Sequence, residues 1–139
     1  MTDSNLIYAY TASDAERDGL LLRFSPATTL EAGYALPVLL TQKAYAEAVE
    51  WTRGGSWQTE NARWWDVLMV ARRAAAAALK TGSTQLTRVA RVPNLTDSGK
   101  PSRAERPKGV SLEVHAEGFD LTGTPCIIIS TPGERLNGE

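Results

Sequence analysis

The sequence is poor in the residues from which most metal sites and nucleophilic active sites are built. Its 139 residues include a single cysteine, Cys126, and a single histidine, His115. One cysteine excludes an intrachain disulfide, and one of each residue falls short of the three or four ligands that a zinc site takes. Cys126 precedes three isoleucines, which is typical of a buried thiol rather than a reactive one. We therefore expect no metal, no cofactor and no enzymatic activity.

Long apolar runs and phosphate-binding loops are missing as well. No apolar run reaches the ~18 residues that a membrane span needs. The polar stretch 1–5 lacks the basic-then-apolar order of a signal peptide. Gly54 and Gly55 have neither the spacing nor the lysine of a P-loop. We expect a cytoplasmic protein that does not bind a membrane.

What the sequence does contain is the composition of one ordinary globular domain. Apolar residues make up 42% of the chain and charged residues 22%. A chain of this length and composition buries most of its apolar surface without a disulfide or a metal. We expect residues 1–139 to form a single domain, with the segment 93–109, which is rich in proline and glycine, as a flexible loop.

Helix start and stop signals divide the first fifty residues. Serine or threonine N-caps and glycine stops predict short helices over about 12–18, 26–32 and 42–51. Short apolar stretches predict strands or extended segments over 6–10, 20–24 and 34–40. Pro37 has no N–H for a sheet ladder, so we expect its segment to be an edge strand or irregular.

The longest regular pattern predicts a helix from about residue 60 to residue 80. Its apolar side chains recur at steps of three and four and mark the face that we expect to pack on the core: Trp64, Leu68, Ala71, Ala75 and Leu79. Charged side chains mark the opposite, solvated side: Arg63, Asp66, Arg73 and Lys80. The helix is expected to end at Gly82.

The last third of the chain has the pattern of a β meander. A first strand is expected over 85–92, and the segment 110–116 alternates apolar and polar residues. The three isoleucines within 124–130 are typical of a strand covered on both faces. The chain is therefore predicted to be α+β: a small, mostly antiparallel sheet packed against one long helix, with two or three short helices.

A set of short segments spread over most of the chain carries a family resemblance: Ile7–Thr11, Ala15, Asp18–Leu21, Glu31–Tyr34, Pro37–Val38, Thr41 and Arg63–Leu68. They resemble an uncharacterised bacterial and phage family, domain of unknown function 6573. The family occurs on phages, plasmids and other mobile elements, so the resemblance implies that setting. It implies no reaction, and the segment 93–109 departs from the family's pattern.

The tryptophans are clustered in the sequence. All four fall between residues 51 and 65, and Arg53 and Arg63 interleave with them. Aromatic side chains with cationic neighbours bind single-stranded nucleic acid, but tryptophans at helical spacing also anchor the core between packed helices. Trp57 lies in a Gly-Ser segment, and we predict that it belongs to a partner-binding surface together with Arg53.

Charge is distributed unevenly along the chain. Residues 72–108 carry nine basic and two acidic side chains, whereas 1–66 and 109–139 each carry a net charge of −4. For protein binding we predict four further cations: Lys100, Arg103, Arg106 and Lys108. For nucleic acid the predicted set is Arg88, Arg91, Lys100 and Arg103. The sequence pI of about 5.9 favours docking onto a protein.

Three functional hypotheses follow. The first is a non-enzymatic binding protein of a phage or mobile element that occludes a host or defence protein, as anti-CRISPR inhibitors do. The alternative is a nucleic-acid-binding accessory protein that uses the basic segment 72–108. The third is a small enzyme using His115, which we otherwise expect to be a surface residue on the polar face of its strand.

Overall fold

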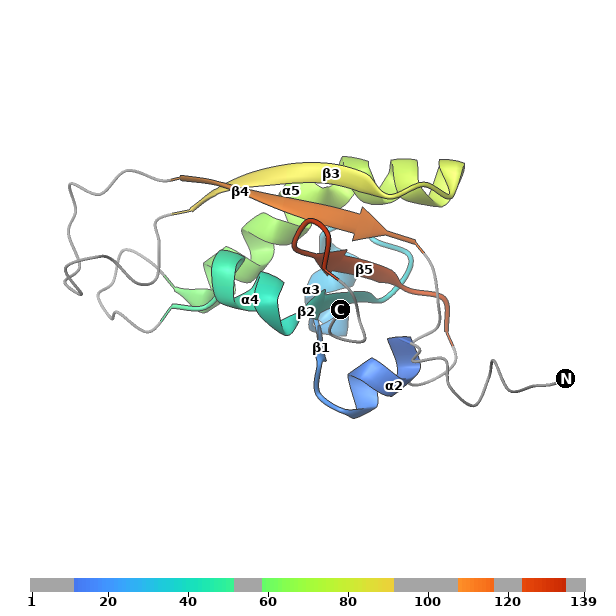
Figure 1. Cartoon of the computed structure of the whole chain (residues 1–139), viewed down its shortest axis with the longest axis horizontal. Coiled ribbons are helices and arrows are strands. Elements are labelled where there is room, and N and C mark those ends of the chain that lie inside the picture. The colour runs from blue at the N-terminus through green and yellow to red at the C-terminus, as the bar shows by residue number, and fades with distance from the viewer. Residues whose placement is uncertain (1–11, 52–58, 92–107, 117–123, 135–139) are drawn as a thin grey trace, which may run out of the picture.

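The computed structural model describes residues 12–51, 59–91, 108–116 and 124–134 (Figure 1). The helices and strands follow one another as α2 (Ala12–Arg17), β1 (Leu21–Arg23), α3 (Pro26–Glu31), β2 (Val38–Thr41), α4 (Gln42–Ala48), α5 (Glu60–Thr81), β3 (Gln85–Arg91), β4 (Lys108–His115) and β5 (Ile127–Ser130). The strand expected over 6–10 lies outside the described residues.

The strands form one five-stranded sheet in the order β1-β2-β5-β4-β3. β3, β4 and β5 pair antiparallel in sequence order, which confirms the predicted meander. β5 then pairs parallel with β2, and β1 pairs antiparallel with β2 at the far edge. Figure 1 shows β3 at one edge of the sheet and β1, with α2 beside it, at the other. The predicted α+β fold with a mostly antiparallel sheet is therefore confirmed.

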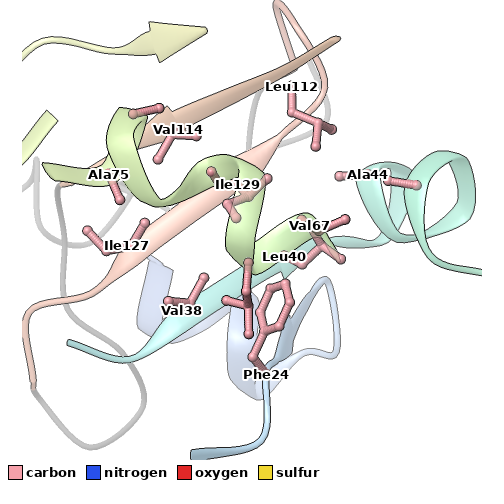
Figure 2. Packing of buried hydrophobic residues seen from close by; sticks show 14 of the residues in the cluster. Phe24, Val38, Leu40, Ala44, Val67, Ala75, Leu112, Val114, Ile127 and Ile129 are labelled. Atoms are coloured by element: carbon pink, nitrogen blue, oxygen red, sulfur yellow. The ribbon is translucent and has the colours of Figure 1, made fainter. Parts of the chain in front are cut away.

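α5 covers one face of the sheet and builds the main core. Its buried side chains meet the inward-facing side chains of β2, β4 and β5, among them Leu40, Leu112 and Ile129. Figure 2 shows these side chains gathered between the helix and the sheet. Burying each such leucine or isoleucine contributes about 1.5–3 kcal/mol, so this layer is the main source of stability.

α2 covers the other face, at the β1–β2–β5 end. Ala12 and Ala15 pack with Leu39, Cys126 and Ile128 in a second, smaller core. β5 therefore lies between two layers and all four of its residues are buried, as the isoleucine run predicts. α2 does not extend over β3, which lies at the opposite edge of this face, and Leu86 of β3 is 70% exposed there.

The helix boundaries follow local chemistry. The hydroxyl oxygens of Thr41 and Thr59 each accept a hydrogen bond, at 3.1 Å, from the N–H three residues later. Gly82 takes a left-handed φ of +73° and ends α5 where predicted. Ser25 caps α3 without a side-chain hydrogen bond. There the Thr29 hydroxyl donates to the Ser25 carbonyl instead, so the cap differs from the one expected.

The expectation for Pro37 is wrong. β2 begins at the next residue and pairs with β1 on one side and β5 on the other, so it is an interior strand. Pro37 precedes the first residue of β2 and joins the ladder through its carbonyl, which accepts a hydrogen bond from the N–H of Ile127 at 2.9 Å. A proline at the start of a strand is compatible with an interior position because it leaves the following N–H groups intact.

The predicted inner face of α5 is partly wrong. Leu68, Ala71 and Ala75 are buried as expected, but Leu79 is 53% exposed and Arg63 is 1% exposed. The buried stripe of α5 is shifted around the helix relative to the predicted one. It includes small residues, Ala74 and Ala78 among them, and these let α5 approach the sheet closely. Leu79 is left outside this contact.

Candidate partner-binding surface

Most residues of the predicted binding sets lie outside the described parts of the chain. These are Arg53, Trp57, Lys100, Arg103 and Arg106. The described members are Arg88, Arg91 and Lys108. Lys108 and Gly109, assigned above to a loop, belong to β4.

Arg91 is buried and supports the fold, which corrects its assignment to a nucleic-acid surface. Its Nε donates to the Ala48 carbonyl at 2.7 Å and its Nη2 to the Arg63 carbonyl at 3.0 Å. Its Nη1 forms an ion pair with Asp66 at 3.2 Å. Burial lowers the pKa of Arg91, and the hydrogen bond to Asp66 opposes that shift. With only 5% of Arg91 exposed, its guanidinium is not presented to a phosphate.

Arg63 plays a similar part at the end of α4. Its Nε donates to the Val49 carbonyl at 2.8 Å, and its guanidinium lies 5.2 Å from the centre of the Trp51 ring. Desolvation by burial, with a smaller contribution from nearby Arg91, lowers its pKa to about 10. The two arginines bind the last carbonyls of α4, the negative end of its dipole. They thereby hold α4, α5 and β3 together.

Arg88 and Lys108 are exposed but do not form one patch. Arg88 pairs with Ser111, and Lys108 pairs with Arg91. Because side chains alternate along a strand, Arg88 lies on the open face and Lys108 on the face shared with Arg91. A Cβ at Gly109 would clash with the Arg88 guanidinium, so this side chain lies flat across β4.

His115 joins three segments. Its Nδ1 lies 3.0 Å from the Thr84 hydroxyl and its Nε2 lies 3.0 Å from the Ser130 hydroxyl. A serine beside a histidine is one arrangement for nucleophilic catalysis. Here Ser130 is 2% exposed, and a threonine occupies the position where a triad places a carboxylate. This geometry favours a structural role for His115 in tying β3, β4 and β5 together.

A groove runs along the outer side of α5, against the connection between α3 and β2. We call it the α5 groove. Its volume is about 580 Å³, and its lining includes Tyr34, Leu36, Met69, Val70, Arg72, Arg73, Ala76 and Leu79. Met69 and Leu79 are exposed large apolar side chains. The spacing of Met69, Arg72, Ala76 and Leu79 by three and four puts them in one row along the helix.

Tyr34 joins one wall of the groove to the backbone of α5. Tyr34 donates a hydrogen bond from its hydroxyl to the Leu68 carbonyl at 2.6 Å. Burial raises the pKa of Tyr34 to about 12, with a smaller opposing effect from Arg72. Gly33 has a φ of +96°, and a Cβ there would lie 3.3 Å from the central guanidinium carbon of Arg72. Arg72 therefore lies directly against the backbone at Gly33.

Arg72 and Arg73 place two positive charges beside the apolar row. Both side chains are exposed. Within the described part of the chain neither forms an ion pair. Exposed apolar side chains beside cations that the described residues leave unpaired are a surface that an acidic, amphipathic partner would cover.

Comparison with known proteins gives no relative. No family model, curated protein or solved structure matches the chain. The family resemblance therefore stays an expectation. In the described ranges, no group of three or more His, Cys, Asp and Glu is placed to hold a metal, and no helix is long and apolar enough to span a bilayer.

The α5 groove was missed because Leu79 fits the stripe that α5 presents to the core. The row of Met69, Arg72, Ala76 and Leu79 was visible as a second stripe on the same helix. A helix with two apolar stripes has more apolar surface than one sheet can cover. That surplus is the signal in the sequence that points to the groove.

Proposed function

We propose that this chain is a non-enzymatic binding protein that holds a partner protein in the α5 groove. The observation that carries the proposal is the exposed row of Met69 and Leu79 with Arg72 and Arg73 beside it. Contacts of this kind combine apolar burial, which supplies affinity, with charge pairing, which selects the partner.

The partner that fits is an amphipathic segment with carboxylates flanking apolar side chains. Its apolar side chains would pack on Leu36, Met69 and Leu79. Its carboxylates would reach the two arginines, whose planar guanidinium groups bind carboxylates through paired hydrogen bonds. Like charges at these positions would be rejected, so a basic segment is excluded as the occupant.

The biological target belongs to the same proposal. A host or defence protein of the cell that carries the mobile element is the target that the family resemblance implies. An anti-CRISPR-like inhibitor needs only to occlude a surface, which an apolar groove with charged neighbours does without any reaction. The nucleic-acid alternative, based on the segment 72–108, remains the competing function.

Site-specific photo-crosslinking in host cells tests the proposal. A benzophenone amino acid replaces Met69 in one variant and Glu47, an exposed residue of α4, in a matched control. We expect the Met69 variant alone to crosslink one protein, through a peptide containing carboxylates next to apolar residues. Equal products from both variants, products removed by nuclease, or no product would contradict the proposal.

A further inference from the structure

The two edges of the sheet differ in how they are protected. β1 has three residues, and the last of them, Arg23, is held by both oxygens of Glu16 at 2.8 and 3.0 Å. β3 has seven residues, all paired in unbroken register with β4. Among the described residues, no backbone hydrogen bond from outside the sheet reaches β3. A long, regular edge strand of this kind is a template for another strand.

α5 extends alongside this edge and supplies an apolar surface next to it. The Thr87 hydroxyl donates to the Val70 carbonyl at 3.1 Å, which fixes this turn of α5 beside β3. Val70 is 38% exposed, and Ala77, two turns further on, lies on the same side of the helix. At 100° per residue this side is roughly 130° around α5 from the row of the α5 groove. Val70 itself also lines the α5 groove, so this surface adjoins the groove along the helix.

The open face of the sheet adds charge to this edge. Leu86 and Arg88 of β3 both lie on that face by alternation, and Leu86 is 70% exposed. A strand beside β3 would place one row of its side chains near Val70 and the other row on the face that carries Arg88. The Arg88 guanidinium lies over Gly109 of β4 and must turn towards the edge to meet that row. Apolar side chains suit the first row and carboxylates the second.

We infer that the edge of β3 that the described residues leave unpaired accepts an extended segment of a partner protein as a sixth strand. The segment alternates apolar residues, which contact Val70 and Ala77, with acidic residues, which lie beside Arg88. Main-chain hydrogen bonds to β3 supply the affinity and the alternation supplies the selectivity. Two copies of β3 paired about their centre would put two Arg88 side chains opposite each other, which opposes self-pairing. The inference does not depend on the α5 groove.

An alternating peptide tests the edge directly. The probe is an eight-residue peptide of valine and glutamate in alternation, capped at both ends and titrated into the full chain labelled with nitrogen-15. We expect chemical-shift changes to centre on β3 amides and on Ala77, with slowed amide exchange along β3. No binding, or shifts centred on the α5 groove, would overturn the inference. Dimerisation of the chain through β3 without peptide would overturn the choice of occupant.

Two N-methylated peptides are the matched controls. Methyl groups sit on the valine nitrogens in one and on the glutamate nitrogens in the other, and the side chains are unchanged. Since successive N–H groups of a strand point to opposite edges, one peptide should lose about tenfold or more in affinity and the other should bind as before. Equal affinity for both would show that no strand is added.

A charge exchange tests the role of Arg88. Arg88→Glu should weaken the valine–glutamate peptide and strengthen a valine–lysine peptide by a similar factor. Leu79→Glu, in the α5 groove, should leave both affinities unchanged. This control separates failure of the edge inference from failure of the groove proposal. Unchanged affinities in Arg88→Glu would remove Arg88 from the site.

Discussion

Arg91 donates from its Nη2 to the backbone carbonyl of Arg63 at 3.0 Å, so the cation of β3 and the backbone of α5 are joined directly. Both guanidinium groups also bind the end of α4, through the carbonyls of Ala48 and Val49. The junction is buried, and its charge is compensated in part by Asp66. Two arginines that look like surface residues in the sequence are thus part of the framework.

The first prediction concerns this junction. Arg91→Met should lower the free energy of unfolding by about 3 kcal/mol, because it removes the Arg91 donors from two buried carbonyls and leaves Asp66 without its ion pair. Arg88→Met, three residues earlier on the open face, should change it by less than about 0.5 kcal/mol. Urea denaturation of both variants measures the difference. Equal, small effects would show that the Arg91 hydrogen bonds do not contribute to stability.

The second prediction concerns the close contact between α5 and the sheet. Ala78 is 1% exposed, whereas Ala76 is exposed on the same helix. Ala78→Leu should destabilise the protein by about 1–3 kcal/mol, because the contact has no space for the larger side chain. Ala76→Leu should be close to neutral. Thermal unfolding of the pair gives the comparison, and equal melting temperatures would contradict the described packing of α5.

The third prediction is a pH dependence. The pKa of Tyr34 is raised from 10.0 to about 12 in the folded state, so the folded protein disfavours its ionisation. The associated stability is fully present below pH 10 and is lost as the pH rises from 10 to about 12. The Tyr34→Phe variant should therefore lose less stability than the parent between pH 10 and about 12. Near neutral pH its free energy of unfolding should be about 1 kcal/mol lower than that of the parent.

This comparison must be made between the variant and the parent at each pH. The pKa of Arg63 is lowered to about 10, which makes the folded state gain stability over the range in which Arg63 loses its proton. Tyr45, whose pKa is also raised to about 12, adds to the loss. Both effects are common to the two proteins and cancel in the difference. Parallel curves for parent and variant between pH 10 and 12 would contradict the assignment to Tyr34.

The fourth prediction separates binding from folding in the α5 groove. Leu79 is 53% exposed, so Leu79→Glu should change the free energy of unfolding by less than about 0.5 kcal/mol. The same variant should lose crosslinking through position 69, because a carboxylate would stand where the partner's apolar side chain packs. Leu68→Ala, in the core, should instead lower the stability by about 2–5 kcal/mol. Intact crosslinking in Leu79→Glu would exclude Leu79 from the contact.

Local signals in the sequence were enough to predict most of the described elements. Thr41 starts α4, Gly82 ends α5, and the alternation of Val110, Leu112 and Val114 gives the buried face of β4. These features depend on residues close together in the chain. The tertiary pairings do not, and the parallel pairing of β2 with β5 left no local pattern. Pro37 was misjudged for this reason.

The candidate sites were harder to predict because the sequence alone does not show whether a charged or an apolar side chain is buried or exposed. Arg91 shares its side of β3 with Val89, and both are buried. That parity was the one sequence signal of its structural role. Leu79 was assigned to the core because periodicity alone does not show how far the helix is rotated on the sheet. Only the packing of the alanines fixes that rotation.

The account's central claim is that the α5 groove binds its partner through apolar contacts and arginines together. The most direct test is the dissociation constant of the partner captured through position 69, measured for the parent and for Arg72→Glu, with Arg88→Glu as control. The account predicts that Arg72→Glu weakens the affinity about tenfold or more and that Arg88→Glu leaves it unchanged. A lysine in place of the partner's carboxylate should restore the affinity for Arg72→Glu. Equal affinity of the parent and Arg72→Glu would contradict it.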